Sequence, residues 1–94
     1  MGLSDKQRSA LRIALDILNA VQELHDAKPT HILNKANLSH DRLVRYVDRL
    51  LERNLIEAHQ DGENRFYTLT PRGVQFLLEM RRAEDFVVGF GLSL

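Results

Sequence analysis

The sequence predicts a mainly α-helical fold with one small β-hairpin, in the order helix, helix, helix, hairpin, helix. Three observations lead to this prediction. Apolar residues recur at helical spacing over 4–27, 40–53 and 71–88. Two short β-type runs, 55–59 and 65–69, flank an Asp-Gly pair that is typical of a hairpin. Capping residues and prolines separate the segments.

Length and composition fit one small globular domain over residues 1–94. The 13 basic and 13 acidic side chains cancel, so net charge gives no argument for a nucleic-acid partner. The chain has no cysteine, which excludes a disulfide scaffold, a cysteine-ligated zinc finger and a thiol nucleophile. No apolar run approaches the length of a membrane span, and residues 1–6 do not resemble a signal peptide. We therefore expect a cytoplasmic protein.

The first helix is predicted to begin with Ser4 as its N-cap and to reach Ala27, before Pro29 ends it. Its apolar arc covers more than half of the circumference, so the helix needs neighbours on two sides. The residues that widen this arc into a second apolar face are Ile13, Ile17 and Leu24.

A short helix over 31–36, with Thr30 as its cap, is followed by a tight turn at Asn37-Leu38. Ser39 is a strong N-cap for a third helix over 40–53, which Asn54 can close in the left-handed conformation. Two helices joined in this way form a helix-turn-helix, and the hairpin that follows adds a wing.

The third helix separates apolar from basic side chains. Its apolar arc comprises Leu43, Val44, Val47, Leu50 and Leu51. Its arginines project from the opposite side: Arg42, Arg45, Arg49 and Arg53. Arginines in such a row bind guanine edges and phosphates, which is typical of a recognition helix in the major groove of DNA. The alternative is a solvated face on which they pair with Asp41, Asp48 and Glu52.

Several residues around this helix are candidates for contact with DNA. Those at the third helix are Ser39, His40, Arg42, Arg45, Tyr46 and Arg49; those at the short helix are Thr30, His31 and Lys35; those in the wing are Asn64 and Arg65. The first group would read the groove, except Tyr46, which would stack or bond at a phosphate. The short helix would contact the backbone, and the wing would contact the backbone or enter the minor groove. Two alternatives remain open: a partly buried aromatic role for Tyr46, and an ordinary solvated tip for the wing.

The last helix begins at Thr70-Pro71, an N-cap followed by proline at the first helical position. Val74, Leu77 and Leu78 are expected to close the core. A second apolar stripe comprises Phe76, Met80, Ala83, Val87 and Phe90. Its spacing alternates between four and three residues, which is a heptad seam. This stripe, together with Ile13, Ile17 and Leu24, is predicted to form a homodimer interface.

Enzymatic chemistry is not expected. His25, His31, His40 and His59 show no metal-ligand spacing, and neither a phosphate-binding loop nor a nucleophile elbow is present. We therefore predict no catalytic residue, no metal and no cofactor.

The motifs Ile32-Leu33-x-x-Ala36-Asn37-Leu38-Ser39 and Tyr67-x-Leu69-Thr70-x-x-Gly73 resemble the winged helix-turn-helix family common among small archaeal DNA-binding and chromatin-associated regulators. The resemblance covers about residues 10–80, with Asn54 where the family often has glycine. It implies DNA binding, and dimerisation through a C-terminal helix that forms an antiparallel coiled coil.

The sequence thus predicts a homodimeric, double-stranded-DNA-binding transcriptional regulator or small chromatin protein at the nucleoid. Residues of about 30–70 would form the helix-turn-helix and wing, and residues 71–94 would dimerise. The alternative is a winged-helix module that binds protein and not DNA, because the net charge is zero and carboxylates flank the arginine row.

Overall fold

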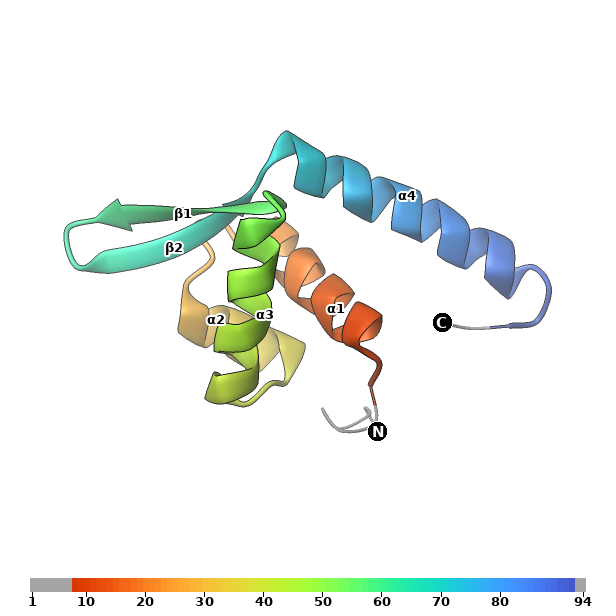
Figure 1. Cartoon of the computed structure of the whole chain (residues 1–94), viewed down its shortest axis with the longest axis horizontal. Helices are drawn as coiled ribbons and strands as arrows, with labels where there is room; N and C mark the ends of the chain where they lie inside the picture. Colours follow the sequence, from red (N-terminus) through yellow and green to blue (C-terminus); the bar gives the residue numbers. More distant parts are fainter. Residues whose placement is uncertain (1–7, 93–94) are drawn as a thin grey trace.

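The structure is a computed structural model that describes residues 8–92. Its elements are α1 (Ala10–Glu23), α2 (Pro29–Ala36), α3 (His40–Glu52), β1 (Ile56–Asp61), β2 (Asn64–Leu69) and α4 (Pro71–Val88). This order confirms the predicted fold class. The first three helices cluster together, the antiparallel hairpin projects to one side of them, and α4 runs out to the other side (Figure 1). Within residues 8–92, no helix is long and apolar enough to cross a bilayer.

α1 is shorter than predicted. It begins at Ala10 because the side chain of Ser9 accepts a hydrogen bond from the Arg12 amide at 3.0 Å. The predicted cap, Ser4, lies outside the described residues. The helix ends at Glu23, and the predicted end at Ala27 is wrong. The carbonyl of Ala27 instead accepts a hydrogen bond from the Tyr67 amide at 2.9 Å, which ties this segment to the hairpin.

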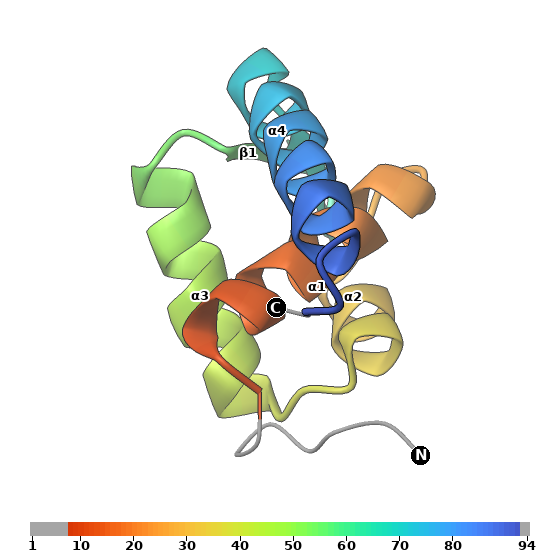
Figure 2. The same cartoon turned by 90° about the vertical axis from the view of Figure 1, so that its right-hand side faces the viewer.

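The core surrounds α1, which lies among α2, α3 and α4 (Figure 2) and also contacts β2. Ile13 and Ile17 have no exposed surface at all. The prediction that they face a partner is therefore wrong, because neighbours within the same chain cover the second apolar face. Leu24 remains half-buried and packs against the core.

The helix-turn-helix forms as predicted, with one correction at its start. Thr30 is not the cap of α2; Lys28 holds that position, and Pro29 begins the helix. Proline suits the first helical position because its fixed φ matches a helix and its missing N–H has no helical partner there. Asn37 then turns the chain with φ 55°, a left-handed conformation that asparagine tolerates.

α4 is seated on the start of β1 by a buried contact. Thr70 caps α4: its hydroxyl accepts from the Gly73 amide at 2.9 Å and donates to the Asn54 carbonyl at 2.6 Å. A Cβ on Gly73 would lie 2.0 Å from the carbonyl oxygen of Leu55, so only glycine fits here. This close approach explains the Thr-x-x-Gly motif physically.

Beyond this seat, α4 leaves the body of the molecule. Leu77 is fully buried as predicted, but Val74 and Leu78 are 46% and 42% exposed, so their assignment to the core is wrong. Phe76 and Met80 pack against the core in their place. Because α4 contacts α1 along one narrow side only, the rest of the surface of α4 is exposed to solvent.

Polar contacts hold α4 to α1 along that side. Arg12 pairs with Glu84, and the Arg81 guanidinium donates to Asn19 Oδ1 at 2.7 Å and to Gln22 Oε1 at 2.8 Å. Arg12, Asn19 and Gln22 thus give α1 a polar side on which α4 lies.

Candidate nucleic-acid interface

α3 presents a basic outer face, as the sequence predicted. It begins at Ser39, whose side chain accepts a hydrogen bond from the Arg42 amide at 3.3 Å. Leu43, Val47 and Leu50 are buried on the inner side. Arg45 and Arg49 are exposed on the outer side, while Arg42 is half-buried.

The arginines of this helix are not neutralised by its carboxylates. Within residues 8–92, Arg42, Arg45, Arg49 and Arg53 form no ion pair, and neither do Asp41, Asp48 and Glu52. The alternative of a face held together by arginine–carboxylate pairs therefore gains no support from the geometry. The guanidiniums keep their donors available for an external acceptor.

Two arginines are held over tyrosine rings. The Cζ atom of Arg49 lies 5.5 Å from the ring centroid of Tyr46, and that of Arg65 lies 5.6 Å from the ring centroid of Tyr67. Both distances fall within the range of cation–π attraction. Tyr46 is half-buried against the core, so it is the partly buried aromatic that the sequence left open and also a support for Arg49.

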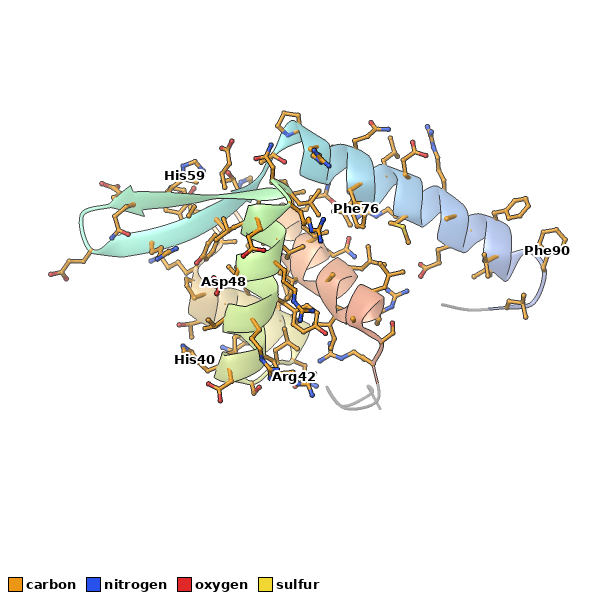
Figure 3. The ribbon with its side chains drawn as sticks, viewed as in Figure 1. His40, Arg42, Asp48, His59, Phe76 and Phe90 are labelled. Atoms are coloured by element: carbon orange, nitrogen blue, oxygen red, sulfur yellow. The ribbon has the colours of Figure 1, made fainter. Side chains whose placement is uncertain are left out.

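The wing and α3 share a groove. A hollow of about 260 Å³ lies between them, and His40, Asp48 and Arg65 are among the residues that line it. Figure 3 shows His40 and Asp48 on α3, with the hairpin extending above them. The structure therefore brings His40 of α3 and Arg65 of β2, two residues predicted from distant segments, to one surface.

One apolar residue of this groove was not predicted to be exposed. Val44 was assigned to the apolar arc facing the core, yet it is 44% exposed and lines the hollow. An exposed methyl-bearing side chain on such a helix can contact the methyl group of thymine. The signal available in the sequence was its place at the edge of the apolar arc.

The residues predicted to contact the DNA backbone from α2 differ in whether their side chains are already paired. Thr30 and His31 are exposed in the first turn of α2. Lys35 is occupied, because its Nζ lies 2.8 Å from a carboxylate oxygen of Glu23 on α1. Both partners of this pair are about half exposed, so the pair contributes little to stability and opens readily.

The wing is a two-sided hairpin. Asn64 lies at its tip opposite Asp61, next to Gly62 with φ 62°. On the face opposite Arg65, the ring of His59 stacks on Phe66 at a centroid distance of 4.9 Å, and its Nε2 lies 2.7 Å from the Thr68 hydroxyl. On this second face His59 and Thr68 are hydrogen-bonded to each other. In the part of the chain that the structure describes, no group of three or more acidic or metal-ligating side chains is placed to hold a metal ion.

A short helix, a left-handed turn, a capped helix with free arginines and an arginine-bearing hairpin together define a winged helix-turn-helix protein. The family model for winged helix-turn-helix proteins matches residues 7–87, and the chain belongs to this family. None of the curated proteins matches the sequence.

Several solved structures share the fold. The DNA-binding protein Sso10a-2 from Sulfolobus solfataricus has a TM-score of 0.77 at 17% identity, over 88% of this chain and 85% of that one. The transcriptional regulator BldR from Sulfolobus solfataricus has a TM-score of 0.74 at 23% identity, over 85% and 59%. A MarR family transcription regulator, SP03579, has a TM-score of 0.75 at 21% identity, over 89% and 63%. The chain thus spans about three fifths of the length of the last two.

Proposed function

We propose that this chain binds double-stranded DNA as a homodimeric transcriptional regulator or small chromatin protein of the nucleoid. The observation that carries the proposal is the outer face of α3. Its exposed arginines have no carboxylate partner within residues 8–92, although carboxylates stand beside them on the same helix. Burying such donors against phosphates and base edges gives them the acceptors that they lack.

Each basic element has a distinct role in this proposal. Arg45 and Arg49 enter the major groove, where a guanidinium binds the O6 and N7 acceptors of guanine. Arg65 of the wing contacts the sugar–phosphate backbone at the edge of the same groove. The first turn of α2, with Thr30 and His31, lies against a phosphate, as helix N-termini favour. Lys35 joins them when its exposed pair with Glu23 opens.

The structural relatives support the same function. Two of them are a DNA-binding protein, Sso10a-2, and a transcriptional regulator, BldR. Because they share 17% and 23% identity with this chain, they support the class of function and give no DNA sequence.

The dimer is the second part of the proposal. The end of α4 projects from the body with Phe86, Val88 and Phe90 more than half exposed, a large apolar surface for an isolated chain. Ala83 and Val87 of the predicted stripe lie on the same projecting half. A two-fold axis through this region would present two recognition helices to successive major-groove faces, about 34 Å apart.

A salt titration of binding to random duplex tests the DNA-binding part. If the dimer neutralises about six phosphates, the slope of log affinity against log salt is near −5. A slope near zero, or no binding in dilute salt, contradicts the proposal and favours the alternative, a winged-helix module that binds protein. The zero net charge makes this a demanding test, because non-specific attraction over the whole surface is weak.

A further inference from the structure

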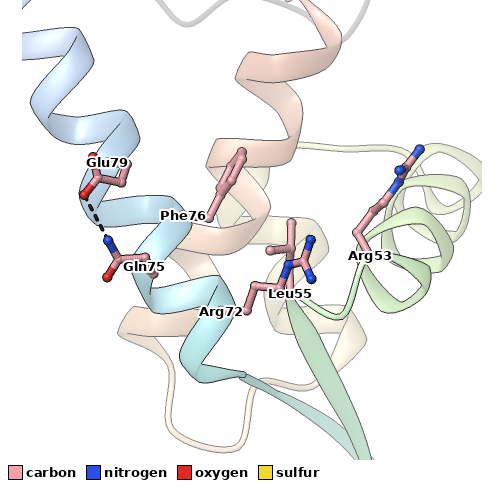
Figure 4. Close-up of a pocket in the computed structure, with 6 residues that line it drawn as sticks. All are labelled: Arg53, Leu55, Arg72, Gln75, Phe76 and Glu79. Carbon is pink, nitrogen blue, oxygen red and sulfur yellow. Dashed lines mark hydrogen bonds between the residues drawn. The ribbon is translucent and has the colours of Figure 1, made fainter.

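An open groove lies where the end of α3, the start of β1 and the start of α4 meet (Figure 4). Its volume is about 450 Å³, and it is lined by Arg53, Leu55, Arg72, Gln75, Phe76 and Glu79. Leu55 and Phe76 form the apolar floor, and both belong to or pack against the core. This groove shares no lining residue with the hollow beside Arg65, and none of the residues that we propose to contact DNA lines it.

Some of the charged side chains at the rim of this groove have a partner of opposite charge, and others do not. Glu79 accepts a hydrogen bond from Gln75 at 2.9 Å and pairs with Arg82 at 3.3 Å. Arg53 and Arg72 form no ion pair within residues 8–92. The groove therefore suits an apolar occupant, with two free cations beside it.

The other end of α4 carries side chains of matching character. Phe86 and Phe90 are 70% and 71% exposed, and their rings meet edge to face at a centroid distance of 5.1 Å. At 100° per residue, Phe86 lies within about 40° of Arg72 and Glu79 around the helix axis, and Phe90 follows in the turn directly after the helix, with its ring against that of Phe86. One side of α4 thus presents the groove near its start and the aromatic pair near its end.

The aromatic pair cannot fill the groove of its own chain. Phe76 and Val88, the last residue of α4, are separated by roughly 18 Å at 1.5 Å per residue, and Phe90 lies in the turn beyond Val88. Figure 3 shows Phe76 in the first half of α4 and Phe90 beyond its far end. A second copy in the antiparallel direction removes this obstacle, because a two-fold axis crossing α4 near Glu79–Ala83 exchanges its two ends.

We propose that Phe86 and Phe90 of a second copy occupy this groove, and that the two copies exchange these residues about the two-fold axis. This inference rests on the dimer of the proposed function and specifies its contacts. Each aromatic side chain buries about 150–250 Å². Four of them, with the groove walls that they cover, bury on the order of 1,000 Å², which is enough for a specific interface. Ala83, a small residue, lies near the crossing and permits a close approach.

The groove also links assembly to the recognition helix. Arg53 is the C-cap residue of α3, and it forms one wall of the groove. When the partner's aromatic pair is seated, the end of α3 is held from outside its own chain. Dimer formation therefore restricts the position of the helix that we propose to read DNA.

Disulfide trapping tests the geometry directly, because the chain has no cysteine of its own. We would mix an Arg72→Cys chain with a Phe90→Cys chain under mild oxidation, leaving Phe86 as an anchor. We expect a covalent heterodimer from the mixture and no covalent dimer from either variant alone, since equivalent positions lie far apart in an antiparallel pair. A covalent homodimer of Phe90→Cys, or no heterodimer in the mixture, overturns the proposal.

A second measurement uses sedimentation of the intact chain. The variant Phe86→Ser with Phe90→Ser should raise the dimer dissociation constant by about 100-fold, since exposed aromatic anchors dominate such contacts. It should stay folded, because neither side chain belongs to the core, and its unfolding temperature should no longer rise with chain concentration. An unmodified chain that is monomeric at micromolar concentration overturns the proposal and leaves the groove to a small apolar anion. Salt-dependent binding of the monomeric variant to a single half-site would still support DNA binding, so the two proposals fail separately.

Discussion

The guanidinium of Arg49 lies over the ring of Tyr46, with Cζ 5.5 Å from the ring centroid. The wing repeats this arrangement with Arg65 and Tyr67. The chain has only two tyrosines, so each of them supports an arginine of the proposed DNA surface. An arginine stacked on a ring keeps its in-plane N–H donors free and has already lost part of its rotamer freedom. Less entropy is then lost when it binds.

Replacing Tyr46 should therefore weaken DNA binding without removing a charge. We expect Tyr46→Leu to lower affinity about two- to five-fold, the size of a cation–π contact at an exposed site. The salt slope should stay unchanged, because Arg49 keeps its charge. Tyr46→Phe, which retains the ring face, is the matched control in a fluorescence-anisotropy titration. Equal losses in the two variants would mean that the hydroxyl, and not the stacking, matters.

Arg45→Ala and Arg49→Ala should each weaken duplex binding by about 1–3 kcal/mol if each side chain makes one base contact. Thermal stability should not change, because both residues point away from the buried Leu43, Val47 and Leu50. Arg82→Ala, which removes an exposed arginine on α4, is the control. Unchanged affinity in the Arg45/Arg49 double variant would favour the protein-binding alternative.

Gly73→Ala should destabilise the fold strongly. The added Cβ would meet the Leu55 carbonyl oxygen at 2.0 Å, and this oxygen belongs to backbone that cannot rotate away. Overpacking of this kind costs about 1–3 kcal/mol or more. Val74→Ala, at the exposed neighbouring position, should change the urea midpoint only slightly. A Gly73→Ala chain with the midpoint of the unmodified chain would show that α4 can lift from its seat without cost.

Arg8 should be important for stability despite its place before the first helix. Its guanidinium donates to the carbonyls of Ala36 and Asn37, at 2.7 Å each, and pairs with Asp16 at 2.8 Å. Arg8→Met leaves these acceptors without the charge-assisted bonds, at a cost of about 2–4 kcal/mol in the free energy of unfolding. Arg82→Met, which breaks the exposed pair with Glu79, should cost much less. Comparable urea midpoints for the two variants would contradict this ranking.

The helix-turn-helix could be predicted from sequence because its signals are local. Ser39, Asn54 and Thr70-Pro71 each specify a cap or a turn through their own backbone chemistry, and the structure confirms all three. β1 begins one residue later and ends two residues later than the predicted 55–59, and β2 begins one residue earlier than the predicted 65–69, because the turn is shorter than predicted. Gly62 at positive φ, followed by Glu63, forms that turn.

The burial of side chains was predicted less well, because it depends on which helix or strand packs against each face. Ile13 and Ile17 were predicted to form an apolar face for a partner and are completely buried within the chain. Val44, Val74 and Leu78 were predicted to lie in the core and are exposed. A helical wheel gives the direction of a side chain but not the element that covers it. Met80 illustrates the consequence: it packs against the core, so a charge placed there would disturb folding as well as assembly.

The DNA-contact residues remain predictions, although the structure adds two relationships that spacing did not reveal. Lys35 is paired with Glu23, and Arg65 shares a groove with His40. Both depend on contacts between segments far apart in the sequence.

The contact between Gly73 and the Leu55 carbonyl has a geometrical consequence for a paired molecule. It sets the angle at which α4 departs from the body, and with it the angle between α4 and α3. In a dimer joined through α4, that angle determines how far apart the two recognition helices lie. The close contact that glycine permits at residue 73 would then determine the spacing of the two DNA half-sites. Any change in this contact would alter the number of base pairs between the half-sites that the dimer can bind.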